Sequence, residues 1–212
     1  MSMASRNGLT ELQRQLAHAF LSRARGFFLT GGAVLVGWEL AHRTTDDLDF
    51  FTDSNDAMAV SDATLRGAAE SLGATVTSLV GSPDFHRYVA QRGDESVRVD
   101  VVRDRTPQLH DKLERDGIRM DSVEEIFVNK ICALVGRSEI RDLVDLMALE
   151  ERGLRVEDSL ALAQRKDASA TPATLGWLLS TLTIPEGPDR ARLQRYAKDL
   201  ERRMLALAVP SP

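Results

Sequence analysis

Two aspartates, Asp47 and Asp49, form the most informative chemical pattern in the sequence, because only Leu48 separates them in a short apolar segment that ends in Phe50 and Phe51. Side chains alternate along a β-strand, so both carboxylates are expected on one face. Like charges held this close repel each other, and a hard divalent cation such as Mg²⁺ offsets that repulsion. The pattern predicts a metal site at the two aspartates, although such a pair is also common at a solvated strand end.

Two consecutive glycines, Gly31 and Gly32, follow the apolar run Phe27–Leu29 and precede an apolar segment that continues to about His42. Glycine lets the backbone approach a ligand closely, and backbone N–H groups at the start of a helix bind phosphate. The pattern indicates a strand, a phosphate-binding turn and a helix, while the alternative is a plain chain reversal. The combination of this unit with the acidic strand is more specific than either part.

A third acid, Asp100, lies in a β-branched strand expected over residues 96–102, where it shares one face with Arg98 and Val102. One interpretation is that strand pairing brings Asp100 beside Asp47 and Asp49 as a further metal ligand. The other is that Asp100 is an exposed residue on the polar face of an antiparallel sheet.

A lysine, Lys130, interrupts an apolar helical pattern that contains Phe127, Ile131 and Leu134. A lysine in such a place either extends its amine to water or meets an anion. From the helix alone, extension to water is favoured. The transfer of a phosphoryl group needs a cation of this kind, since charge on the phosphoryl oxygens must be neutralised.

Two further acids, Asp142 and Asp145, are three residues apart and are expected on one face of a helix. Arg141 and Asp145 have the spacing of an ordinary surface ion pair, which favours a structural role for Asp145. Asp142 is the better candidate for a functional site.

These two blocks together resemble a known family. Gly31–Ala33 and the segment His42–Phe51 (HRTTDDLDFF) resemble motif I of the nucleotidyltransferase superfamily, and Asn129–Leu146 resembles a second motif, K-x-x-A-L-x-x-R followed by R-D-x-x-D-L. Both are similar to motifs of the AbiEii/AbiGii-type toxins, the nucleotidyltransferases of type IV toxin–antitoxin systems, which include the MenT toxins. The triplet Val99–Val101 also matches the superfamily's hydrophobic–Asp–hydrophobic pattern.

The resemblance implies an α+β fold, with a nucleotidyltransferase-like mixed β-sheet core and flanking helices over residues 1–120 and a C-terminal helical region over residues 121–212. It implies catalytic roles for Asp47, Asp49, Lys130 and Asp142, and Mg²⁺ ligation by Asp47, Asp49 and Asp100. It implies nucleotide binding by Gly31, Gly32, Arg43, Thr45 and Lys130. For Arg43 the alternative is a cation that stabilises a helix C-terminus.

By the same resemblance, the chain is expected to move a nucleoside monophosphate from CTP, UTP or GTP to an RNA acceptor, with the 3′ end of tRNA as the leading candidate. It is also expected to be a toxin with a cognate antitoxin. The alternatives are transfer to a small molecule, as in aminoglycoside nucleotidyltransferases, and a non-catalytic nucleotide-binding module.

Composition bounds these hypotheses. The 212 residues carry a formal net charge of −5, so any RNA binding requires a local basic patch. The C-terminal segment offers one candidate, in which basic residues share an arc (Arg192, Arg195, Lys198, Arg202 and Arg203). The single cysteine, Cys132, fits a reducing cytoplasm. No leader precedes Gly8, and the apolar run over residues 27–38 is too short to span a bilayer. These features predict a cytoplasmic protein with no membrane partner.

The remaining pattern predicts the elements that position these residues. Helices are expected after a capping box at Thr10–Gln13, over residues 54–72, from Asp121 to Gly136, after a cap at Ser138, and over residues 156–164, 174–182 and 190–208. Strands are expected over residues 74–80 and 85–91, the latter joined to the strand at 96–102 by a hairpin. Residues 103–120 are expected to form a loop with one short turn, and residues 1–8 to be disordered.

Overall fold

The computed structural model of the chain describes residues 8–41 and 43–209. The expected disorder before Gly8 therefore concerns residues outside the described ranges. The described residues pack into two compact units. The first contains the residues up to Thr106 together with His110–Ser122, and the second contains Pro107–Leu109 together with the residues from Val123 onward.

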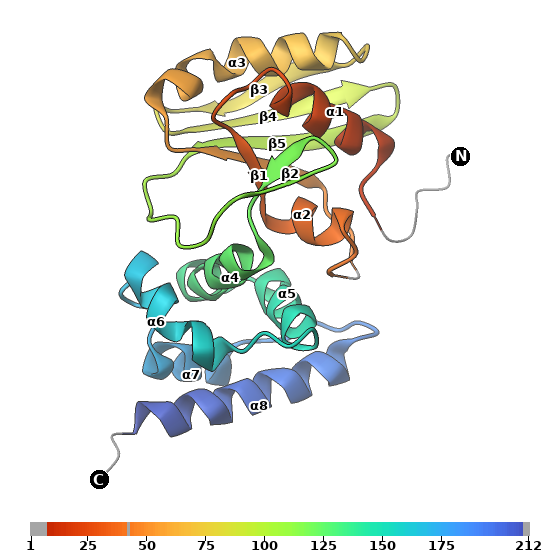
Figure 1. The fold of residues 1–212 in the computed structure, drawn as a ribbon. Helices are drawn as coiled ribbons and strands as arrows, with labels where there is room; N and C mark the ends of the chain where they lie inside the picture. Colours follow the sequence, from red (N-terminus) through yellow and green to blue (C-terminus); the bar gives the residue numbers. More distant parts are fainter. Residues whose placement is uncertain (1–7, 42, 210–212) are drawn as a thin grey trace. The chain divides into compact units, whose positions relative to one another are not determined.

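The first unit is built on a mixed β-sheet. Its strands lie in the order β3-β4-β5-β2-β1-β7-β6, with β2 parallel to β5, β1 parallel to β7, and the other neighbours antiparallel. The elements of the unit are α1 (Glu11–Leu21), β1 (Phe28–Thr30), α2 (Gly31–Gly37), β2 (Asp47–Thr52), α3 (Asn55–Glu70), β3 (Thr75–Gly81), β4 (Phe85–Arg92), β5 (Glu95–Arg103), β6 (Leu113–Arg115) and β7 (Ile118–Met120). This arrangement confirms the predicted α+β class (Figure 1).

One face of this sheet is apolar and lies beneath α1 and α3 (Figure 1). Leu48 and Phe50 of β2 are fully buried there, and the ring of Phe50 lies 4.4 Å from that of Phe20 in α1. Alternation along β2 therefore directs Asp47 and Asp49 to the opposite face of the sheet. The hydrophobic core on one face thus decides on which face the acidic pair lies.

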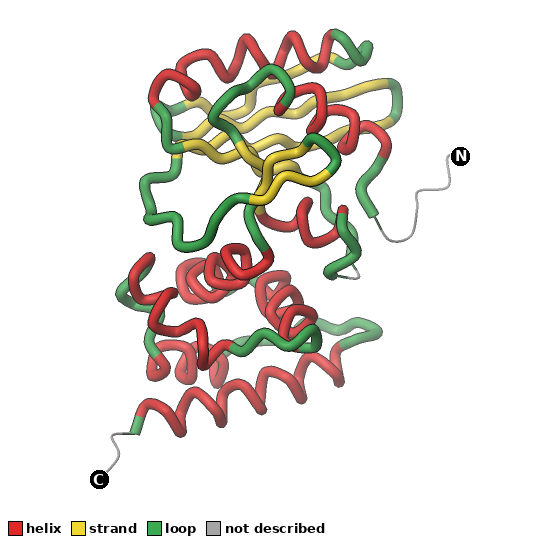
Figure 2. The backbone as a smooth tube through the Cα atoms, in the orientation of Figure 1, coloured by secondary structure: helices red, strands yellow, loops and turns green. Residues whose placement is uncertain are grey.

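The second unit consists of helices and loops in its described part (Figure 2). Its helices are α4 (Val123–Arg137), α5 (Ile140–Glu150), α6 (Val156–Lys166), α7 (Pro172–Thr181) and α8 (Arg190–Ala208). The helix α4 packs against α5 and α6, and α7 packs against α8. None of the helices in the described ranges combines the length and the apolar character that crossing a membrane requires.

Local signals located most elements well. The capping box at Thr10 is present, with Gln13 accepting a hydrogen bond from the backbone N–H of Thr10, and α8 spans the predicted residues. The hairpin between β4 and β5 also has the expected position, with Gly93 in the left-handed conformation at φ 56°.

Three expectations were wrong. The helix expected to continue to about His42 ends at Gly37, and Glu39 after it adopts a left-handed φ of 57°. Residues 113–120 form the hairpin β6–β7 rather than a loop, because Asp116 and Gly117 both adopt positive φ, as a tight two-residue turn requires. The predicted cap at Ser138 is also wrong: Glu139 is the N-cap of α5, and Ser138 instead adopts a left-handed φ of 54° between the two helices.

Candidate active site

Three carboxylates lie together on the face of the sheet opposite α1 and α3. Asp47 and Asp49 come from β2, and strand pairing makes Asp49 the register partner of Asp100 in β5. Thr30 at the end of β1 is the register partner of Asp49 on its other side. Asp47 and Asp100 are each 7% exposed. Asp100 is therefore a buried neighbour of the acidic pair, and its interpretation as an exposed residue on a polar face was wrong.

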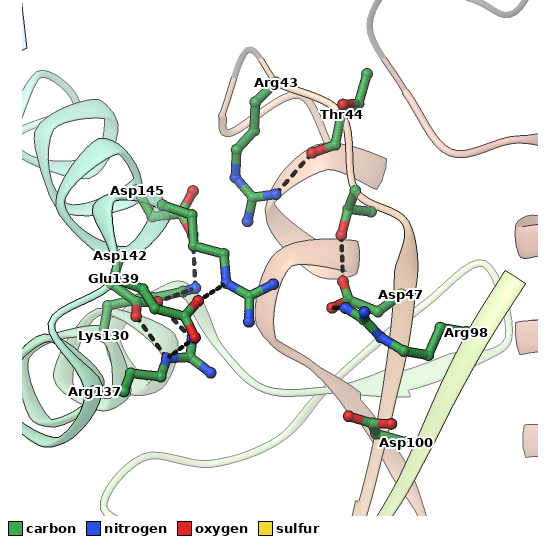
Figure 3. Close-up of polar contacts among 12 residues, drawn as sticks. Arg43, Thr44, Asp47, Arg98, Asp100, Lys130, Arg137, Glu139, Asp142 and Asp145 are labelled. Carbon is green, nitrogen blue, oxygen red and sulfur yellow. Dashed lines mark hydrogen bonds and ion pairs between the residues drawn. The ribbon is translucent and has the colours of Figure 1, made fainter. Parts of the chain in front are cut away.

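Arginine and threonine side chains hold two of these carboxylates. Thr45 donates from Oγ1 to Oδ1 of Asp47 at 2.7 Å, and Arg98 donates to Oδ2 of Asp47 at 2.6 Å (Figure 3). Arg87 makes two hydrogen bonds to Asp100, from Nε to Oδ1 at 2.8 Å and from Nη2 to Oδ2 at 2.7 Å. The hydrogen bond to Asp100 is the main reason that the pKa of the Arg87 guanidinium is raised above its ordinary value.

The two glycines make room for side chains of the same site. Gly31 has a left-handed φ of 68°, and a Cβ placed on it would lie 2.6 Å from Oδ2 of Asp49. A Cβ on Gly32 would lie 2.6 Å from a guanidinium nitrogen of Arg43, whose other terminal nitrogen donates to the carbonyl of Thr44 at 2.8 Å. The left-handed φ favours glycine at position 31, whereas a Cβ at position 32 would require the flexible end of Arg43 to shift. The glycine pair, Arg43, Thr45 and the carboxylates form one cluster.

A buried network that the sequence did not predict fixes the start of this turn. Thr30 donates from Oγ1 to Oδ2 of Asp121 at 2.5 Å, and Lys112 donates to Oδ1 of Asp121 at 2.7 Å. The amine of Lys112 also lies 3.2 Å from the centre of the Phe28 ring. Asp121 is 2% exposed, and the Lys112 amine compensates its negative charge within the first unit. The network ties the end of β1, directly before Gly31, to the residue that follows β7.

The second unit holds the other predicted residues in a cluster of its own. Lys130 of α4 lies 2.8 Å from Oδ1 of Asp142 and 2.7 Å from Oδ2 of Asp145, both in α5 (Figure 3). Arg137 donates from Nε and Nη2 to the two oxygens of Asp142, each at 2.8 Å. Both aspartates are fully buried and Lys130 is 6% exposed. Two cations and two carboxylates thus compensate one another between α4 and α5.

The electrostatics of Asp142 follow from these contacts. Burial by itself raises the pKa of a carboxyl group, but the hydrogen bond from Arg137 and the charge of Lys130 outweigh burial, so the pKa of Asp142 lies below its ordinary value. Asp142 is therefore ionised at neutral pH.

Two structural alternatives from the sequence were wrong. Lys130 does not extend to water, because α5 places two carboxylates against its amine. Asp145 is not a surface residue, because it faces α4 and is fully buried. An ion pair at 2.5 Å joins Arg141, its expected partner, to Glu139.

Sequence reasoning assigned no role to three residues of these clusters, Arg87, Arg98 and Arg137, and expected Asp145 to form only a surface ion pair. A signal existed for Arg98, which shares a strand face with Asp100, and for Arg137, which is the last residue of the quoted K-x-x-A-L-x-x-R pattern. Arg87 depends on the register of β4 against β5, which only the paired strands reveal.

The residues fit a magnesium ion in type and in number. Mg²⁺ is usually bound by one or two carboxylates, with water and substrate phosphates completing its shell. Asp47 and Asp49, with Asp100 beside them, offer such a set of oxygens, and Gly31 leaves the space next to Asp49 clear of any Cβ. Within the described ranges, no group of three or more His, Cys, Asp or Glu side chains already has the arrangement of a metal site.

The basic arc on α8 is largely engaged in ion pairs. Arg192 pairs with Glu151 at 2.5 Å, Arg202 pairs with Asp199 at 2.6 Å, and Arg203 pairs with Glu150 at 2.6 Å. Arg203 also contacts Glu157, and its neighbours raise the pKa of its guanidinium despite burial. The contacts of Arg203 tie α8 to α5 and α6, whereas Asp199, the partner of Arg202, belongs to α8 itself. The arc as an RNA-binding patch stays a prediction.

Comparison with known structures supports the same fold. The chain is similar to JHP933 from Helicobacter pylori, with 21% identity, a TM-score of 0.56, and coverage of 93% of this chain and 92% of that one. A candidate nucleotidyltransferase from H. pylori has 20% identity, a TM-score of 0.55, and coverage of 94% and 99%. At these identities the similarity establishes the fold alone. MenT4, a nucleotidyltransferase toxin from Mycobacterium tuberculosis, has 16% identity, a TM-score of 0.44, and coverage of 92% of this chain and 86% of that one.

Comparison at the level of sequence identifies the family. No curated protein matches the chain. The profile of the AbiEii family, described as the nucleotidyl transferase AbiEii toxin of type IV toxin–antitoxin systems, matches residues 14–208. Since that match includes both motif blocks and nearly the whole chain, the protein belongs to the AbiEii family of nucleotidyltransferase toxins, which implies a nucleotide substrate and an antitoxin partner.

Proposed function

We propose that the protein transfers a nucleoside monophosphate from an NTP to the 3′ end of tRNA in a Mg²⁺-dependent reaction in the cytoplasm. The observation that carries this proposal is the juxtaposition of Asp47, Asp49 and Asp100 across two parallel strands beside the Gly31 turn. These carboxylates would hold Mg²⁺, which would neutralise charge on the phosphates and favour departure of pyrophosphate.

The other residues of the first unit have complementary roles in this proposal. Gly31 and Gly32 allow the triphosphate to lie close to the backbone, Thr45 orients Asp47, and Arg43 neutralises phosphate oxygens. The acceptor hydroxyl oxygen forms a bond to the α-phosphorus, the bond between the α- and β-phosphates breaks, and a carboxylate accepts the hydroxyl proton.

Lys130 and Asp142 are proposed as catalytic residues because of the family motif that contains them. Lys130 would neutralise charge on the triphosphate, and Asp142 would orient Lys130 or accept the proton of the acceptor. Their mutual contact at 2.8 Å supports the orienting role of Asp142.

The test is a transfer assay with Mg²⁺, each labelled NTP in turn, and either total tRNA or a mixture of aminoglycosides. Label on tRNA is the expected result, while label on the aminoglycosides would support the small-molecule alternative. Nucleotide binding without transfer to either would support a non-catalytic module.

A matched pair of variants tests the metal assignment. Asp49→Asn should abolish transfer while the protein stays folded, and Asp53→Asn should leave transfer unchanged, because Asp53 is an exposed residue that follows β2. Full activity in Asp49→Asn would show that the metal assignment is wrong.

A further inference from the structure

Two arginines of the sheet bind the carboxylates to which the proposed function assigns the metal. Arg87 in β4 is the register partner of Asp100, and Arg98 in β5 is the register partner of Asp47. Register partners extend from the same face of a sheet. Both guanidinium groups therefore lie on the face that carries the acidic cluster, and both donate directly to carboxylate oxygens of that cluster.

Burial differs sharply between the acids and the arginines. The side chains of Asp47 and Asp100 are 10% and 11% exposed, whereas those of Arg98 and Arg87 are both 38% exposed. Buried carboxylates in close proximity need a positive group beside them. A partly exposed arginine, by contrast, exchanges a carboxylate for water or another anion with little loss. The arginines are thus the exchangeable partners in these two pairs.

The arginines and a metal ion need the same atoms. Arg87 occupies both oxygens of Asp100, and Arg98 occupies Oδ2 of Asp47, while Oδ1 of Asp47 accepts from Thr45. A divalent cation binds carboxylates through these same oxygen lone pairs. A cation bound at these oxygens would share their lone pairs and neutralise their charge, which would weaken both arginine pairs.

From these contacts we propose that Arg87 and Arg98 take the place of the divalent cation when none is bound, and that cation binding releases their guanidinium groups to bind the phosphates of the nucleotide. This inference rests on the proposed function and deepens it, because it names the groups that receive the triphosphate and couples their availability to the metal.

The charges of the cluster explain why the two events are coupled. The formal charges of Asp47, Asp49 and Asp100 are balanced by those of Arg43, Arg87 and Arg98. A divalent cation added to this balanced cluster leaves an excess of positive charge, which a triphosphate offsets. The planar guanidinium group also matches phosphate oxygens in pairs, so a released arginine is well suited to that ligand.

The experiment measures metal and phosphate binding separately, without any transfer reaction. Mn²⁺ binding is followed by electron paramagnetic resonance in the absence of nucleotide, for the wild type and for Arg87→Gln and Arg98→Gln. Binding of inorganic triphosphate is then measured by calorimetry at saturating Mg²⁺. Each glutamine variant should bind Mn²⁺ about tenfold more tightly and inorganic triphosphate about tenfold more weakly than the wild type, a shift of ~1.4 kcal/mol in each case.

Arg66→Gln is the matched control. Arg66 also pairs with an aspartate, Asp62, at 2.9 Å and has a 46% exposed side chain, but it lies on α3 at the other face of the sheet. Its replacement should change neither affinity. If a glutamine variant does not fold, Arg87→Lys and Arg98→Lys retain the charge but lose the forked geometry, and they should shift both affinities in the same directions by a smaller factor.

The outcomes separate this inference from the proposed function. Unchanged or weaker Mn²⁺ binding in both glutamine variants would show that the arginines do not compete with the cation. Unchanged triphosphate binding would show that the released arginines do not bind phosphate. If the wild type binds no Mn²⁺, or binds it as well after Asp49→Asn, the metal assignment itself fails. A purely structural role would not strengthen one affinity while it weakens the other.

Discussion

Asp49 in β2 and Asp100 in β5 are register partners on adjacent parallel strands, although they are far apart in the sequence. Their neighbours on the opposite face, including Phe50 and Val101, are fully buried beneath the helices of the first unit. Burial of these apolar side chains fixes the two strands and offsets the electrostatic repulsion between the carboxylates. This relationship gives the acidic pair its third member and leads to the first prediction.

Asp100→Asn should lower nucleotidyl transfer by about tenfold or more, equivalent to ~1.4 kcal/mol of transition-state stabilisation, because one carboxylate beside the proposed metal is lost. Arg87, its partner, is 38% exposed and remains solvated, so the variant should stay folded. Initial rates with labelled NTP measure the effect. Asp94→Asn, in the exposed turn between β4 and β5, is the control. Equal rates for the two variants would remove Asp100 from the site.

Gly31→Ala should reduce both stability and transfer. The backbone at Gly31 has φ 68°, which costs an alanine about 1 kcal/mol or more, and the new Cβ would meet the carboxylate of Asp49. Gly67→Ala is the matched control, because Gly67 lies within α3 with nothing inside 4 Å of the added Cβ. That change should stabilise the protein by about 0.5–1 kcal/mol. Thermal unfolding and transfer rates distinguish the two variants, and equal behaviour would contradict the geometry of the turn.

Lys130→Met should destabilise the protein by about 3–5 kcal/mol, because it removes the amine that lies against two buried carboxylates, Asp142 and Asp145. Lys198→Met, on the exposed surface of α8, should change stability by less than about 0.5 kcal/mol. Urea denaturation measures both free energies of unfolding. A Lys130→Met protein as stable as the wild type would mean that the buried cluster is assembled differently.

Acidification should weaken the second unit through Asp142. Its pKa is lower in the folded protein than the ordinary value of 3.8, so the ionised carboxylate stabilises the fold at neutral pH. That contribution is complete above the unfolded-state pKa and is lost as the pH falls below 3.8 and through the lower folded-state pKa. Asp142→Asn should be less stable at neutral pH and should lose less stability between neutral pH and the acid range. Urea midpoints over a pH series test this, and parallel curves for the two proteins would refute it.

The thiol of Cys132 should resist alkylation in the folded protein. Burial, assisted by the charge of Asp167, raises its pKa to about 11. At about pH 8 only ~0.1% of such a thiol is the reactive thiolate. Iodoacetamide should therefore label native protein far more slowly than protein in urea, where the pKa returns to about 8.5. Rapid labelling of the native chain, followed by mass spectrometry, would show that the thiol is not shielded.

The sequence by itself determined the local elements and the type of chemistry. Alternation in the Asp47–Phe51 segment places two carboxylates on one face, the glycine pair before α2 signals close approach, and helical periodicity locates α3 and α8. These signals are local, because side-chain direction and capping depend on neighbours within a few positions. The same local reasoning overlooked the Asp116-Gly117 turn, whose signal lies in two residues inside a polar segment.

The tertiary structure alone decided which residues meet. Strand register placed Asp100 beside Asp49 and directed Arg87 and Arg98 onto the carboxylates, while the packing of α5 against α4 enclosed Lys130 between Asp142 and Asp145. Register and helix packing are fixed by burial of whole apolar faces formed by segments distant in the chain. No short stretch of sequence therefore contains the information that pairs an acid with its cation.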